Sequence, residues 1–124
     1  MHETRLRTRW NDFDALGHLT HIAYPMFFDE ARDAFLTETV GEFDAFPVVI
    51  VHLSVDHHGE IRRPAREIVV RTHVTALGRT SMTFEQELSD GERVAATAKA
   101  VVVAWDGAAR AARALTEDER AKLG

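Results

Sequence analysis

The sequence has no cysteine, only three prolines and no long hydrophobic run. The absence of cysteine excludes a disulfide framework, a thiolate nucleophile and a cysteine-ligated zinc site. The longest apolar stretches, residues 45–51 and 100–105, are far shorter than the ~20 residues that cross a bilayer. The first residues also lack the apolar core of a signal peptide. We therefore expect a cytoplasmic protein that has no membrane partner.

Positive charge is also scarce, because 15 lysines and arginines face 20 acidic residues and leave a net charge of −5. This balance argues against nucleic acid as the main partner, although local arginines could still hold a phosphorylated small molecule. The length of 124 residues predicts one domain, residues 1–124. Its core is expected at about residues 3–106, followed by a C-terminal tail, residues 107–124. Thr116 and Glu119 form a capping-box pattern that predicts a short helix in this tail.

Five segments alternate with the period of two that is typical of strands. They are residues 4–10, 49–56, 68–77, 81–88 and 94–105. Alternation in the first segment predicts that Leu6 and Trp10 share a face. In the second it places Val49 on the same face as Leu53. The last three segments are separated by turn sequences at Gly78 and Gly91, which predict antiparallel hairpins.

One segment, from about residue 22 to 40, has helical spacing instead. Its apolar face is expected to carry Tyr24, Phe27, Phe28, Ala31 and Phe35. The opposite face would carry Asp29, Glu30, Arg32 and Asp33. Thr20 is a candidate N-cap, and because of Pro25 either the helix proper begins at that residue or its first turn is distorted. Because so apolar a helix must be buried against something large, the order of elements predicts an α+β fold in which a sheet curls around one helix.

Residues with chemical potential gather in the loop that precedes this helix. Residues 10–21 include two carboxylates and two imidazoles, those of Asp12, Asp14, His18 and His21. A helix N-terminus offers unpaired N–H groups that can stabilise an oxyanion, and a carboxylate beside them can act as a nucleophile or general base. Gly17 would let the backbone and a substrate approach closely.

Two other interpretations of this loop stay open. Asp and Asn before a helix commonly serve as turn and cap residues. A metal site built from Asp14, His18 and His21 is a second alternative, although these spacings match no strong ligand pattern.

The segment from Arg9 to Leu19, together with Tyr24 and residues 28–32, resembles the signature of the hotdog-fold acyl-CoA thioesterases of the 4-hydroxybenzoyl-CoA thioesterase family. The shared core is Asp-x-Asp-x-x-Gly-His, and the turn at residues 77–81 is also similar to that family. The resemblance implies a hotdog fold, in which a five-stranded antiparallel sheet wraps around one long central helix. It also implies a homodimer or homotetramer with the site between subunits.

The resemblance further implies roles for single residues. Asp14 matches the catalytic carboxylate, and Gly17 and His18 belong to the same motif. The backbone N–H of His21 matches the donor that polarises the thioester carbonyl. Thr20 and His21 stand where the family has paired asparagines. We expect the hydrolysis of an acyl-CoA or acyl-carrier-protein thioester, with no metal and no bound cofactor.

The remaining substrate-binding candidates are four arginines, a threonine and a tyrosine. Arginine binds phosphate in bidentate geometry, and coenzyme A carries phosphates. Three arginines lie between two predicted strands: Arg62, Arg63 and Arg66. Arg79 lies in a predicted hairpin turn, and for each arginine the alternative is a solvated turn residue. Thr20 and Tyr24 complete the set as pocket-wall candidates.

Two rival functions stay open at this stage. A hotdog hydratase or dehydratase would use Asp14 and His18 as an acid–base pair. A non-catalytic acyl-CoA-binding oligomer would bind the thioester without consuming it. Release of free thiol from acyl-CoA distinguishes the thioesterase from both.

Overall fold

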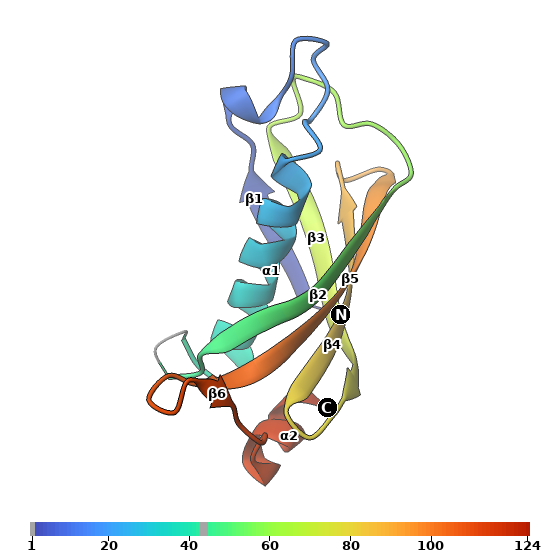
Figure 1. Ribbon diagram of the computed structural model, residues 1–124. Helices are drawn as coiled ribbons and strands as arrows, with labels where there is room; N and C mark the ends of the chain where they lie inside the picture. Colours follow the sequence, from blue (N-terminus) through green and yellow to red (C-terminus); the bar gives the residue numbers. More distant parts are fainter. Residues whose placement is uncertain (1, 43–44) are drawn as a thin grey trace.

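The computed structural model describes residues 2–42 and 45–124. An antiparallel sheet and one long helix, α1 (Ala23–Thr39), make up most of the fold (Figure 1). The strands are β1 (His2–Arg7), β2 (Val48–His57), β3 (Glu67–Leu77), β4 (Ser81–Ser89), β5 (Val94–Asp106) and β6 (Ala111–Ala112). A short 3-10 helix, η1 (Trp10–Asp12), follows β1, and helix α2 (Glu117–Leu123) lies near the C-terminus.

The strand order is β1-β3-β4-β5-β2, which leaves β1 and β2 at the edges, and β6 pairs with β5. The prediction of an α+β fold with an antiparallel sheet and one long helix is confirmed. The prediction of five strands is wrong, because the sheet has six within the described residues. β4 begins opposite Val103, so β5 extends beyond it, and residues 111–112 fold back to pair with Trp105 and Asp106.

The helix α1 buries the apolar face that its spacing predicts. Tyr24, Phe27, Phe28 and Ala31 are all at most 5% exposed, and they pack against buried residues of β3, β4 and β5. A second cluster lies toward the other end of α1, where Leu36 packs with Phe84 and with Leu123 of α2. Both clusters thus lie between the sheet and α1, and Leu123 joins α2 to the second one.

The start of α1 differs from both predictions. The N-cap position is Ile22, which makes no side-chain capping bond, so neither Thr20 nor Pro25 marks the first residue. Thr20 instead accepts a hydrogen bond from the N–H of Ala23 through its backbone carbonyl, at 3.0 Å. Pro25 falls at the third helical position. There its missing N–H costs nothing, because the first N–H groups of a helix have no intrahelical acceptor.

Two strand faces also differ from strict alternation. β1 ends at Arg7, and Trp10 lies in η1 with 76% of its surface exposed, rather than on a shared inner face with Leu6. In β2 the register shifts between Ile50 and His52. This bulge places Ile50, opposite Val102, on the same face as Leu53, and so puts Val49 on the other face.

Within the described ranges, no helix is both long and apolar enough to cross a bilayer.

Candidate active site

The chain between η1 and α1 forms a small hairpin, here called the site loop (residues 12–21). Phe13 and Leu19 pair as an isolated antiparallel bridge. The N–H of Asp14 donates to the carbonyl of His18 at 2.9 Å. Gly17 closes the turn with φ of +79°, a conformation that glycine adopts without steric cost. The hairpin therefore holds Asp14 and His18 opposite each other at its tip.

The carboxylate of Asp14 has a defined position on this loop. Its Oδ1 accepts hydrogen bonds from the N–H of Leu16, at 2.9 Å, and from the N–H of His18, at 3.1 Å. Its Oδ2 makes no hydrogen bond with any residue that the structure describes, and the side chain is exposed. Asp14 is therefore a turn residue and also a fixed carboxylate with one oxygen available for chemistry.

The imidazole of His18 points to a different partner. Its Nε2 lies 2.8 Å from Oε2 of Glu60, whereas the hydrogen bonds between His18 and Asp14 involve the backbone N–H and carbonyl of His18. Glu60 also lies 3.6 Å from the Nε of Arg62. No local signal selects Glu60 from the sequence, because it lies far from the site loop along the chain and belongs to no motif.

The segment 58–66 lies against the site loop and so brings Glu60 and Arg62 close to His18 (Figure 1). The N–H of Leu19 donates to the carbonyl of Ile61 at 2.7 Å, and the N–H of Arg63 donates to the carbonyl of Gly17 at 2.8 Å. The structure thus places Arg62 and Arg63 beside the site loop. Arg62 is exposed, and Arg63 is partly buried.

The approach to α1 provides an unpaired donor. Within residues 2–42 and 45–124, the N–H of His21 has no hydrogen-bond acceptor, and His21 is exposed. Thr20, by contrast, donates its N–H to the carbonyl of Asp12 at 2.8 Å. The N–H of His21 is therefore a free donor on the same loop as the carboxylate of Asp14.

Asp12 has a structural role. It is 5% exposed, its Oδ2 accepts the N–H of Arg9 at 2.7 Å, and its Oδ1 accepts Nη2 of Arg9 at 3.0 Å. These bonds close η1 and turn the chain away from β1. Both carboxylate oxygens of Asp12 are therefore used in bonds that hold the fold, whereas Asp14 uses one oxygen in this way.

The other two candidates lie apart from the tip of the loop. Tyr24 is 3% exposed and meets the ring of His57 edge to face, with centroids 4.7 Å apart; burial raises the pKa of its hydroxyl. Arg79 lies beyond the far end of β3, where its carbonyl accepts the N–H of Leu115 just before α2. Because β3 has eleven residues, it separates Arg79 from Arg63 by roughly 33 Å at ~3.3 Å per residue.

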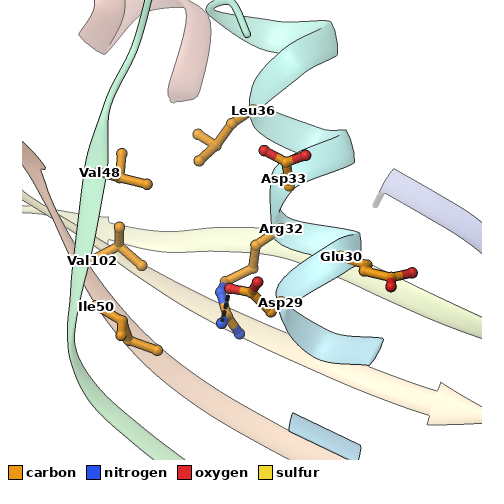
Figure 2. A pocket seen from close by; sticks show the side chains of 8 residues that line it. All are labelled: Asp29, Glu30, Arg32, Asp33, Leu36, Val48, Ile50 and Val102. Carbon is orange, nitrogen blue, oxygen red and sulfur yellow. Dashed lines mark hydrogen bonds and ion pairs between the residues drawn. The ribbon is translucent and has the colours of Figure 1, made fainter. Parts of the chain in front are cut away.

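A cavity of about 290 Å³ lies between α1 and β2, outside the site loop (Figure 2). Its apolar side is formed by Leu36, Val48, Ile50 and Val102, and its other side by charged residues of α1. Among the latter, Arg32 was expected on the exposed face, but it is only 4% exposed. It bonds Asp29 at 3.2 Å, and burial lowers the pKa of its guanidinium.

The described part of the chain contains no group of three or more His, Asp or Glu side chains arranged to hold a metal ion. In particular, the structure does not bring the side chains of Asp14, His18 and His21 together as such a group.

A model of the thioesterase-like superfamily matches residues 8–123. The chain belongs to the thioesterase-like superfamily. No curated protein matches it.

Solved structures resemble this superfamily member over nearly its whole length. The PA5185 protein from Pseudomonas aeruginosa is 30% identical, with a TM-score of 0.86, 99% of this chain covered and 89% of that chain. A predicted thioesterase from Bacillus stearothermophilus is 23% identical, with a TM-score of 0.88 and coverage of 98% and 92%. A thioesterase from Thermus thermophilus, complexed with coenzyme A and Zn, is 23% identical, with a TM-score of 0.87 and coverage of 98% and 95%.

Proposed function

We propose that this thioesterase-like protein hydrolyses an acyl-CoA thioester to a free acid and coenzyme A. The observation that carries the proposal is the geometry of Asp14, whose carboxylate is fixed by two backbone N–H groups and keeps one oxygen unpaired. The unpaired N–H of His21 lies on the same loop. Membership of the superfamily, and the coenzyme A in the Thermus thermophilus relative, support a CoA thioester as substrate.

The proposed reaction uses both groups in the step that forms the tetrahedral intermediate. Asp14 either attacks the carbonyl carbon or removes a proton from the water that attacks it. The N–H of His21 donates to the oxygen that becomes negative in the tetrahedral intermediate. Collapse of the intermediate breaks the C–S bond, and the thiolate of coenzyme A leaves and takes up a proton. Water supplies the oxygen of the acid, either directly or by hydrolysing the anhydride formed on Asp14.

The other residues would shape the site. Gly17 leaves room for the substrate at the turn, and His18, held by Glu60, fixes the tip of the loop. Thr20 and the buried ring of Tyr24 would form part of the pocket wall. Arg62 and Arg63 lie beside the loop and would meet the phosphates of coenzyme A.

A role for Arg79 requires a second copy of the chain, because β3 separates it from the site loop of its own copy. We therefore include a homodimer, or a dimer of dimers, in the proposal. Exposed apolar side chains on the edge strand β2 support the proposed dimer. Ile50 and Leu53 are 44% and 36% exposed, although they lie on the sheet face that α1 packs against. A second copy would cover them and pair with the free edge of β2.

Within the superfamily, we place the chain in the 4-hydroxybenzoyl-CoA thioesterase family, as one domain over residues 1–124. The imidazole of His18 favours hydrolysis over hydration, because it pairs with Glu60 and does not form an acid–base pair with Asp14. The structure offers no comparable support for the hydratase.

A thiol-release assay tests the proposal. Aromatic, short-chain and long-chain acyl-CoAs, and an acyl-carrier-protein thioester, are incubated with the protein after exhaustive chelation. We expect release of free thiol from at least one acyl group. A hydratase would change the acyl group without releasing thiol, and a binding protein would leave the thioester intact. Either outcome contradicts the proposal, as does hydrolysis that stops on chelation and returns with zinc.

A further inference from the structure

A second cavity, of about 230 Å³, lies beside the site loop and is here called the arginine pocket. Its principal lining residues are Arg9, Trp10, Phe13, Arg63 and Arg66. Among the residues that the structure describes, no acidic residue lines it, although the whole chain carries a net charge of −5. The pocket is thus a local concentration of positive charge on an acidic protein.

Arg63 is held in place at the centre of this pocket. Its guanidinium carbon lies 3.8 Å from the ring centroid of Trp10 and 5.3 Å from that of Phe13. Stacking of this kind fixes the guanidinium plane before any ligand arrives. Its Nε is buried and has no acceptor among the described residues, and its Nη2 makes only a long bond, 3.4 Å, to the carbonyl of Trp10. The guanidinium of Arg63, which carries five N–H donors, therefore has donor capacity left for an acceptor in the pocket.

The charges in the pocket differ in how far they are neutralised. Arg9 is paired with Asp12. Arg63 and Arg66 have no carboxylate oxygen within 4.0 Å in residues 2–42 and 45–124. Two cations are therefore available to an incoming anion, and arginine binds phosphate through two parallel hydrogen bonds.

The exposed ring of Trp10 indicates that the ligand of this pocket carries a flat ring as well as a phosphate. Trp10 is 76% exposed, although an indole ring is among the most apolar side chains. An exposed aromatic ring beside arginines is the arrangement that stacks a nucleobase and holds its phosphates. The combination favours a ligand that is both a flat heterocycle and a phosphate ester.

We propose that the arginine pocket binds the phosphorylated adenosine of the coenzyme A thioester, with the phosphates on Arg63 and Arg66 and the adenine on Trp10. This inference rests on the proposed function for the identity of the ligand. The position of the pocket agrees with it, because Arg63 is hydrogen-bonded to Gly17 of the site loop and Trp10 lies four residues before Asp14. The nucleotide and the acyl end of one substrate would thus lie at the same end of the fold.

Direct binding tests the inference without any catalysis. Adenosine 3′,5′-bisphosphate is titrated by calorimetry into the wild type and into Trp10→Leu, Arg63→Met and Arg66→Met, with inorganic phosphate and adenosine as separate ligands. Arg110→Met, which removes an exposed arginine on the turn before β6, is the matched control. We expect each pocket variant to lose about tenfold or more in affinity for the bisphosphate, and the control to lose none.

Three results would overturn the inference: no binding to the wild type, equal affinity in all variants, or an affinity for inorganic phosphate equal to that for the bisphosphate. Because Arg63 also packs on the rings of Trp10 and Phe13, its substitution could disturb the fold. Trp10→Leu and Arg66→Met change exposed side chains and keep the test decisive.

A kinetic comparison separates this inference from the proposed function. The same acyl group is presented on coenzyme A and on pantetheine, which lacks the nucleotide. We expect Trp10→Leu and Arg66→Met to raise KM for acyl-CoA about tenfold relative to KM for the acylpantetheine. Equal effects on both substrates overturn the inference. If the wild type hydrolyses neither thioester but binds the bisphosphate, the proposed function fails and the pocket assignment stands.

Discussion

Arg32 donates a hydrogen bond of 2.9 Å to Oε1 of Gln86, and both side chains are at most 4% exposed. The amide nitrogen of Gln86 in turn donates to the carbonyl of Phe28 and to Oγ1 of Thr72, each at 3.0 Å. The network therefore ties α1 to β3 and β4 through one amide group. Among the described residues, the charge of Arg32 is balanced by Asp29 alone, through its Nη2.

Gln86→Met removes the acceptor for a buried guanidinium while keeping a side chain of similar size. We expect the free energy of unfolding to fall by about 2–4 kcal/mol, because Arg32 then keeps a buried charge with an incomplete set of partners. Urea denaturation at pH 7 measures the change. Glu85→Gln, on the exposed face of the same strand, is expected to stay within about 0.5 kcal/mol of the wild type. Equal stability of Gln86→Met and Glu85→Gln would contradict this account of the network.

The proposed dimer predicts the state of the protein in solution. Ile50→Glu introduces a carboxylate on the face of β2 that a second copy would cover, beside the acidic residues of α1. We expect the wild type to sediment as a dimer or tetramer at micromolar concentration and Ile50→Glu to shift toward the monomer. Val94→Glu is the matched control, since Val94 is similarly exposed, at 42%, but lies on β5. A wild type that is monomeric and fully active would refute the dimer.

The ion pair between Glu119 and Arg113 predicts acid sensitivity at the C-terminal end of the fold. Two hydrogen bonds of 2.8 Å to Arg113, and a third from the N–H of Thr116, lower the pKa of Glu119 from 4.5 to about 2. Because the folded-state pKa is lowered, this stabilisation is fully present above about pH 4.5 and is lost as the pH falls toward 2.

Glu119→Gln is therefore expected to lower Tm by roughly 4 °C at pH 7, with the difference shrinking as the pH falls below about 4.5. Calorimetric scans of both proteins between pH 7 and pH 3 measure this dependence. A difference in Tm that stays constant across the range would show that the charge of Glu119 contributes nothing.

The order of elements could be predicted because periodicity is a local property of the chain. The five longer strands and α1 lie within a few residues of their predicted bounds for this reason. The bulge at Val51 could not be predicted, because the alternation of residues continues through it without any signal. The burial of Arg32 was also missed, since it depends on Gln86, 54 residues away, which supplies its partner.

In the candidate site, too, local features could be predicted and contacts between distant segments could not. Asp14, Gly17, His18 and His21 could be selected from the sequence because they lie within eight residues and form one loop. Glu60, the partner of His18, could not be selected from the sequence, because it reaches His18 only when segment 58–66 packs on the loop. Trp10 was assigned to a strand, because the capping of η1 by Asp12 has no periodic signature.

The structure also changes the choice of control for the proposed catalytic carboxylate, that of Asp14. On sequence grounds Asp12→Asn would serve, since it removes one charge from the same loop. Asp12 is buried and bonded to Arg9, so Asp12→Asn is expected to lower Tm and confuse the comparison. Asp118→Asn is better matched, because Asp118 is exposed on α2 and makes only a surface pair with Lys122.

The most direct test of the account is the hydrolysis rate of Asp14→Asn. Its Oδ1 can still accept the N–H groups of Leu16 and His18, so the loop is expected to keep its shape and Tm to stay unchanged. Only the negative charge needed for attack or proton removal is lost. On the acyl-CoA that the wild type hydrolyses, we predict that kcat falls by ~10²-fold or more and that Asp118→Asn keeps the wild-type rate. A folded Asp14→Asn variant that releases thiol at the wild-type rate would contradict the account.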